Sequence, residues 1–189
     1  MKGVNTTLPG YFLSFDPDTQ LAQIQIALQL IDSKKQNFKA PPLVEVPVYF
    51  PSGGDFSLEI EVTNGAEGIV IFSQRCIDAW MDQGGDAIQA IQRQFDMSDA
   101  MFLPGMKSQP NKMADFQNNG IRLRNKDATN YIWLKNDGTA EIKGNLTVVG
   151  DIESTTKIEA PSVIANDKEL AEHTHPAGSP PGNTGVNNS

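Results

Sequence analysis

Residues 120–148 read GIRLRNKDATNYIWLKNDGTAEIKGNLTV, and this stretch decides the fold. Apolar and polar residues alternate in segments of only a few residues, and Asn, Asp or Gly residues separate the segments. Alternation with a period of two is typical of β-strands that bury one face. Ile121 and Leu123 share one face of the first segment, and Ile132 and Leu134 share one face of the second. Each predicted strand therefore brings only a pair of apolar residues to one side.

The same pattern continues towards the C-terminus and predicts a shaft over residues 112–165. The further apolar positions are Ala140, Ile142, Leu146, Val148, Ile152 and Ile158. Strands with only two apolar residues each can cover one wall of a core, and one chain has no second apolar layer to pack against them. Three identical chains would each supply one wall of a prism, which is a triple-stranded β-helix. A flat meander packed on the N-terminal domain is the alternative that the pattern leaves open.

Residues 1–111 have the pattern of a small β-barrel with short helices. Tyr11–Phe15 is strand-like, the turn signal Asp16-Pro17-Asp18 follows, and Leu21–Leu30 alternates with a period of two. Further strands are expected at Val44–Phe50, Phe56–Val62 and Ile69–Phe72, and short helices at about Ile77–Met81 and Asp86–Phe95. Short strands that close on themselves suit an OB-fold. The sequence therefore predicts an all-β protein with an N-terminal OB-fold domain.

The composition argues against several classes of function. The 189 residues carry a formal net charge of −8, and the isoelectric point is near 4.7. An acidic chain does not suit binding to nucleic acid or docking on anionic lipid, which both need clustered Lys and Arg. The single cysteine, Cys76, excludes an intrachain disulfide, and we expect it to be a small buried apolar residue. No secretory signal or membrane-spanning run is visible, so we expect a protein that is soluble when made.

The only two histidines of the chain, His173 and His175, flank Thr174 in a tail rich in Pro, Gly and Asn. Residues i and i+2 of an extended segment point to the same side, and neutral imidazole is a common metal ligand. One chain offers two nitrogens, which is too few for a stable site, whereas three chains meeting on an axis offer six. The alternative is that both histidines are solvated in a flexible tail. We treat residues 166–189 as a separate tip, or apex, domain.

Three parts of the chain together resemble a known family. They are Leu8–Gly10, Asp16-Pro17, Val46–Pro51 and Gly65–Trp80 in the N-terminal domain, Phe95–Ala100 leading into Leu103–Gly105, and His173-Thr174-His175. In these segments the sequence resembles the central spike, or cell-puncturing, proteins of the baseplate of contractile-tailed bacteriophages. The N-terminal segments are the more specific part of the match, and the resemblance extends over nearly the whole chain.

The resemblance implies a homotrimer with an OB-fold collar, an intertwined β-helical shaft and a metal-bound apex. His173 and His175 of each chain would hold one structural iron ion on the axis. Six imidazole nitrogens suit an octahedral ion, whereas structural zinc prefers four ligands in a tetrahedron. Nickel or cobalt would fit the same geometry. No cofactor other than the metal is expected, and the chain has no room for a lysozyme-like insertion.

The resemblance also implies the partners and the location. The N-terminal domain would dock on baseplate hub or tail tube proteins, and the host outer membrane would be the target. The protein would be made in the cytoplasm of the bacterial host and would lie at the baseplate tip of the virion. No nucleic acid partner is expected.

The leading interpretation of the function is a mechanical device without enzymatic activity that punctures the outer membrane during infection. One alternative is a trimeric tail fibre tip that binds a receptor or glycan, although the last aromatic residue is Trp133. A metalloenzyme that uses the two histidines is the other alternative, but it lacks a third histidine ligand. We expect no catalytic residues. The carboxylate pairs Glu59/Glu61 and Asp96/Asp99 are expected to be solvated strand and turn residues rather than glycosidase groups.

Overall fold

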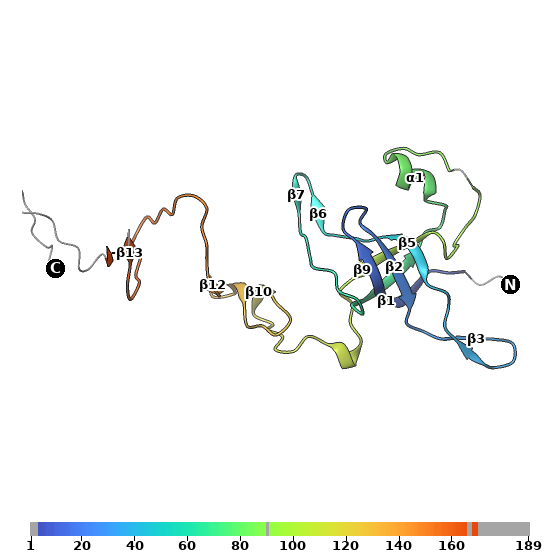
Figure 1. Cartoon of the computed structure of the whole chain (residues 1–189), viewed down its shortest axis with the longest axis horizontal. Coiled ribbons are helices and arrows are strands. Elements are labelled where there is room, and N and C mark those ends of the chain that lie inside the picture. Colours follow the sequence, from blue (N-terminus) through green and yellow to red (C-terminus); the bar gives the residue numbers. More distant parts are fainter. Residues whose placement is uncertain (1–3, 90, 166–167, 170–189) are drawn as a thin grey trace, which may run out of the picture. The chain divides into compact units, whose positions relative to one another are not determined.

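The computed structural model describes residues 4–89, 91–165 and 168–169, which are predominantly β (Figure 1). A five-stranded antiparallel sheet forms the N-terminal part, in the order β5-β2-β1-β8-β9. Its strands are β1 (Thr7–Asp16), β2 (Leu21–Ile26), β5 (Leu43–Pro47), β8 (Glu67–Phe72) and β9 (Ala100–Pro104). The predicted all-β character is thus confirmed.

The first hairpin forms because Asp16 closes its turn. One carboxylate oxygen of Asp16 accepts a hydrogen bond from the Asp18 N–H at 3.0 Å, and the other accepts one from the Thr19 hydroxyl at 2.9 Å. These two bonds lower the pKa of Asp16, in that order of effect. Strands β1 and β2 then pair from Asp16↔Leu21 to Gly10↔Ile26, with a register shift between Phe12 and Ser14. The turn chemistry visible in the sequence therefore sets the register.

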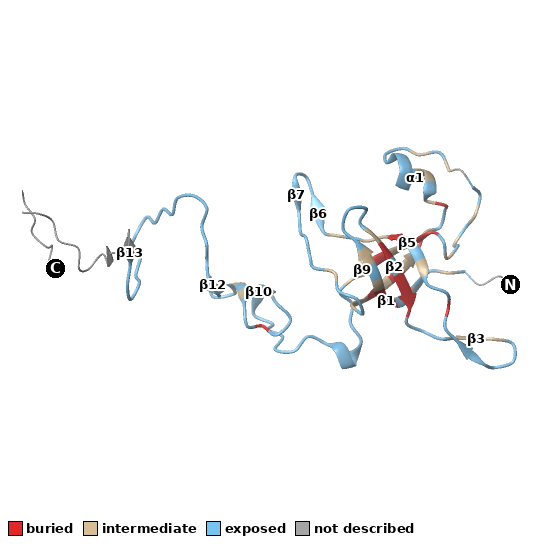
Figure 2. Cartoon of the chain, in the orientation of Figure 1, coloured by how far each residue is buried: buried red, intermediate tan, exposed pale blue. Residues whose placement is uncertain are grey.

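The two edges of this sheet meet. Val48, just after β5, forms a parallel bridge with Phe102 of β9, and the Tyr49 N–H donates to the Phe102 carbonyl at 2.9 Å. Phe102 also packs edge-to-face on Phe12, with ring centroids 4.7 Å apart. Together with Ile24 and Val70 these rings are fully buried, and Figure 2 shows the buried residues concentrated on these strands. One chain closes this core by itself.

Two small hairpins and one short helix extend from the sheet. The hairpins are β3 (Leu30–Ile31) with β4 (Asn37–Phe38) and β6 (Ser52–Gly53) with β7 (Phe56–Ser57). Helix α1 (Asp78–Gln83) lies close to the predicted position of the first helix, and a 3-10 turn, η1 (Gln109–Asn111), follows β9. The second helix, expected over Asp86–Phe95, is absent from the described residues of that segment. The strand expected over Phe56–Val62 is wrong beyond Ser57, because residues 58–62 have no partner strand.

A second, three-stranded sheet has the order β10-β11-β12. Its strands are β10 (Gly120–Arg124), β11 (Tyr131–Lys135) and β12 (Ala140–Lys143). The strands expected around Leu146, Val148, Ile152 and Ile158 do not form in the single chain: residues 144–163 contain none, and the short pair β13 (Ile164–Ala165) and β14 (Lys168–Glu169) follows.

Contacts divide the chain into two units, Met1–Glu141 and Ile142–Ser189. Residues 144–163 are exposed throughout. Among the described residues, no helix combines the length and the apolar character that crossing a bilayer requires.

We predict that Gly68→Ala destabilises the N-terminal domain. A Cβ atom at Gly68 would lie 2.3 Å from the Leu103 carbonyl oxygen and 2.6 Å from the Phe102 ring, so β8 and β9 would have to separate. Overpacking of this kind costs about 1–3 kcal/mol. The urea midpoint of β-type circular dichroism should fall accordingly.

Gly53→Ala is the matched control, because no atom lies within 4 Å of a Cβ built there. Its midpoint should stay close to that of the unchanged protein. Equal midpoints for the two variants would show that the β8–β9 contact is not tight.

Candidate functional site

The two predicted metal ligands, His173 and His175, lie outside the described residues. The metal-bound apex over residues 166–189 therefore stays a prediction. Two other features of the described chain have the side-chain chemistry of a site. One is a cluster around Cys76, and the other is the three-stranded sheet β10-β11-β12.

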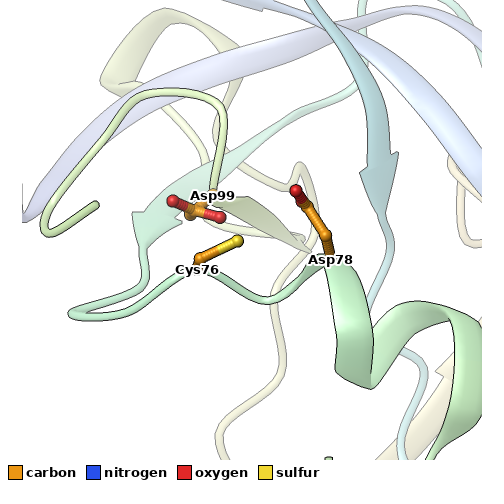
Figure 3. Close-up of side chains that lie close together, drawn as sticks. All are labelled: Cys76, Asp78 and Asp99. Carbon is orange, nitrogen blue, oxygen red and sulfur yellow. The ribbon is translucent and has the colours of Figure 1, made fainter. Parts of the chain in front are cut away.

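Cys76, Asp78 and Asp99 lie within 4.8 Å of one another, measured between the atoms that would bind a metal (Figure 3). Cys76 follows β8, Asp78 begins α1, and Asp99 immediately precedes β9. Cys76 is buried, as the sequence predicted. Asp99 is fully buried, so the expectation that it is a solvated turn residue is wrong.

Arg93 accounts for this cluster. Its guanidinium donates to both carboxylate oxygens of Asp99, at 2.7 and 2.9 Å, and to Asp78 at 2.7 Å. The Ile77 N–H adds a further bond to Asp99 at 3.0 Å. The hydrogen bond to Asp99 contributes most to raising the pKa of Arg93 above its ordinary value. Because the guanidinium of Arg93 already neutralises the two carboxylates, the cluster is a structural ion-pair network and not a metal site.

One face of the sheet β10-β11-β12 is aliphatic and uncovered. Ile121 is 70% exposed, Leu123 53%, Ile132 49% and Leu134 54%. The register pairs Ile121 with Leu134 and Leu123 with Ile132, so the four side chains form one continuous patch. We call this patch the aliphatic face. On β12, Ile142 alternates with Glu141 and is also half exposed.

The opposite face is polar and makes its own contacts. The Arg122 guanidinium lies 5.3 Å from the ring centroids of both Tyr131 and Trp133, and the Lys135 ammonium lies 4.7 Å from that of Trp133. Glu141 accepts a hydrogen bond from the Tyr131 hydroxyl at 2.5 Å and forms an ion pair with Lys135. The bond to Glu141 is the main cause of the raised pKa of both Tyr131 and Lys135. These side chains therefore cover each other, although the buried indole N–H of Trp133 has no hydrogen-bond partner in the described chain.

The asymmetry of the two faces identifies the aliphatic face as the candidate interface. Exposed contiguous apolar patches on soluble proteins usually mark surfaces that bind another molecule. The alternation of Ile121, Leu123, Ile132 and Leu134 predicted this face from sequence. The cation–π contacts on the other face were missed, although Arg122 and Trp133 occupy directly paired positions in the register.

Glu67 anchors the segment that leaves the barrel. Its carboxylate accepts hydrogen bonds from the Ser108 N–H at 2.6 Å, the Ser108 hydroxyl at 2.9 Å and the Asn111 side-chain amide at 2.6 Å. These bonds, the one from the Ser108 N–H first, lower the pKa of Glu67 below its ordinary value of 4.5. Residues 105–111 are therefore tied to β8 at neutral pH.

The comparisons with known proteins agree with the β-rich N-terminal part. The family described as the phage protein Gp138 N-terminal domain matches residues 8–105, slightly more than half of the chain. The chain belongs to this family and is a phage structural protein, a component of the virion. A search of curated proteins found no match.

We predict that Arg93→Met destabilises the protein strongly. The change retains most of the apolar stem but leaves the carboxylate of Asp99, which is 0% exposed, without its cation. Breaking a buried ion pair from one side costs about 3–5 kcal/mol. The urea midpoint, followed by circular dichroism, should fall steeply.

Asp78→Asn is the control from the same network, since the Asp78 side chain is 50% exposed. Losing an exposed ion pair costs at most about 1 kcal/mol. If the two variants unfolded at the same urea concentration, the buried Asp99–Arg93 pair would not stabilise the domain more than the exposed Asp78–Arg93 pair does.

Proposed function

We propose that this phage structural protein is the trimeric central spike of a contractile-tail baseplate, and that it punctures the outer membrane of the host. Its function is mechanical and requires no catalytic group. Membership of the Gp138 N-terminal domain family supports a tail or baseplate protein. The finer assignment rests on the physical arguments below.

The observation that carries the proposal is the aliphatic face of Ile121, Leu123, Ile132 and Leu134. A three-stranded sheet with one apolar face needs a second apolar layer, and each fully buried Ile or Leu side chain stabilises a protein by about 1.5–3 kcal/mol. Three copies arranged around an axis would bury their aliphatic faces against each other. The polar face with Arg122 and Trp133 would then be the outer surface of the shaft.

The strand order of the N-terminal domain supports an OB-type barrel. The order β5-β2-β1-β8-β9, closed by the parallel bridge between Val48 and Phe102, is the strand arrangement of a five-stranded barrel that returns on itself. Such a domain folds within one chain and leaves its outer surface for hub or tail tube proteins. The hydrogen bonds from residues 105–111 to Glu67 would transmit load from this collar to the shaft.

At the tip, His173 and His175 of three chains would hold one iron ion on the threefold axis. Six imidazole nitrogens complete an octahedral shell, so no coordination position is left for a substrate. The ion would therefore be structural. It would fix three chain ends in one narrow apex that concentrates the force of tail contraction on a small area of membrane.

We predict that Ile132→Asp prevents assembly. The change removes about 1.5–3 kcal/mol of apolar burial per chain and places three carboxylates in one apolar core. The unchanged protein should have three times the 20.6 kDa mass of one chain in analytical ultracentrifugation. The variant should sediment mainly as a monomer.

Ile91→Asp provides the control for this experiment, because Ile91 is 52% exposed and lies in the loop before β9 rather than on the aliphatic face. It should leave the trimer intact. A monomeric unchanged protein, or a trimer that tolerates Ile132→Asp, would contradict the proposed shaft.

We also predict one metal ion, iron, for every three chains. Elemental analysis of the purified trimer should give this ratio, and His173→Ala combined with His175→Ala should abolish the metal without dissociating the trimer. Only neutral imidazole binds a metal, so acid near the ordinary histidine pKa of about 6.5 should release it. One ion per chain, or no ion, would exclude the axial six-histidine site.

A further inference from the structure

An open groove of about 1080 Å³ lies beside the barrel and is both apolar and acidic. Aromatic side chains line it from the barrel and from α1, including Tyr49, Phe50 and Trp80. Its other wall is the segment after β7, with Glu59, Ile60 and Glu61. Tyr49, Ile60 and Trp80 are each at least half exposed, and among the described residues no Lys or Arg lines the groove. The groove therefore offers an apolar floor and two uncompensated carboxylates.

The wall of the groove is a segment with the sequence pattern of a strand but without a partner strand. Residues 56–62 read FSLEIEV and alternate as a β-strand does, but pairing stops at Ser57. Within the described part of the chain, no backbone hydrogen bond joins residues 59–62 to another segment. An extended segment with free N–H and C=O groups is a template for pairing with a further strand. The groove is therefore suited to an extended or hairpin-shaped occupant.

The β3–β4 hairpin has the complementary chemistry. Lys34 and Lys35 lie in its turn and Lys39 directly follows its second strand, and all three are exposed. Asp32 fixes the turn by accepting hydrogen bonds from the N–H groups of Lys34 and Gln36 at 2.8 Å. Ile31 is 69% exposed on the same hairpin and Phe38 is 44% exposed. The hairpin therefore combines a basic tip with apolar sides.

In Figure 1 the β3–β4 hairpin and the β6–β7 hairpin extend from opposite sides of the barrel strands. The hairpin therefore does not occupy the groove of its own chain. A projection on one side of a molecule and a matching groove on the other produce a head-to-tail contact, and such contacts close into a ring when the rotation between copies fits.

We propose that the β3–β4 hairpin of each chain docks into the groove of the next chain, so that three such contacts close a ring around the collar. Lys34 and Lys35 pair there with Glu59 and Glu61, while Ile31 and Phe38 cover the apolar floor. This inference rests on the proposed trimer and adds a second interface to it, separate from the aliphatic face of the shaft.

Zero-length cross-linking with a carbodiimide tests the contact in the unchanged protein, because this reagent joins a lysine amine to a carboxylate only when the two touch. Dimeric and trimeric bands should appear on a denaturing gel, and peptides from these bands should join Lys34 or Lys35 to Glu59 or Glu61. The exchanged variant, with Lys34→Glu, Lys35→Glu, Glu59→Lys and Glu61→Lys, should restore the same link with the partners reversed.

Trp80 gives a second readout that does not depend on cross-linking chemistry. In a Trp133→Phe background Trp80 is the only tryptophan, and acrylamide should quench it weakly while the hairpin covers the groove. Lys34→Glu with Lys35→Glu should increase the quenching, and the exchanged variant should return it to the starting value. Lys112→Glu with Lys126→Glu, which makes the same charge change outside the hairpin, should leave it unchanged.

The two proposals fail in different ways. If the protein sediments as a trimer but gives no link between these residues, and charge reversal does not alter the quenching of Trp80, the docking proposal is wrong and the shaft proposal stands. If the protein sediments as a monomer, the proposed trimeric spike itself is wrong. Links confined to the monomer band would place the hairpin in the groove of its own chain and would also overturn the docking proposal.

Discussion

The rest of the structure depends on one burial constraint, which is that the aliphatic face of β10-β11-β12 has nothing in the described chain to pack against. Ile121, Leu123, Ile132 and Leu134 are all at least about half exposed, although their register makes them a continuous apolar layer. The other face is covered by contacts among its own side chains, which include Arg122, Trp133 and Glu141. In the proposed trimer this bare face would be buried against its copies, so folding and assembly of this region would be coupled.

The N-terminal domain meets the same constraint within one chain. Phe12, Ile24 and Phe102 are fully buried because the Val48–Phe102 bridge brings the two sheet edges together. The buried Asp99 is compatible with this core because Arg93 and the Ile77 N–H satisfy its oxygens. The N-terminal domain thus buries its own core, whereas the sheet β10-β11-β12 leaves its aliphatic face uncovered. Glu67 ties the start of the connecting segment to the barrel through its hydrogen bond from Ser108.

Local chemistry explains which features the sequence predicted. The Asp16 turn, strand β1 and the alternating strands β10 and β11 follow from short-range patterns and were predicted correctly. The alternating strand expected over Leu21–Leu30 is confirmed only as far as Ile26, because Leu30 belongs to the separate β3–β4 hairpin. Asp99 was misjudged because its partner Arg93 lies in the segment Asp86–Phe95, which was predicted to be a helix and is irregular in the described residues. Residues 58–62 and 144–163 alternate like strands, but a strand also needs a neighbour, and in one chain that neighbour is missing. The proposed histidine site would be a similar case, since its ligand set would be completed only when chains meet.

The proposed assembly also explains how exposed ion pairs can contribute to the collar contact. Once the shaft holds three chains together, the hairpin of one chain meets the groove of the next at a high effective concentration. The free-energy cost of lost translational freedom has then already been met by assembly of the shaft. Ion pairs between Lys34 or Lys35 and the groove carboxylates would add little affinity between free chains, because exposed pairs contribute at most about 1 kcal/mol each. Between tethered chains they are sufficient to fix the rotation of one barrel against the next, since electrostatic complementarity contributes orientation more than affinity. The shaft would thus supply the stability of the trimer, and the collar would supply the alignment that an axial load requires.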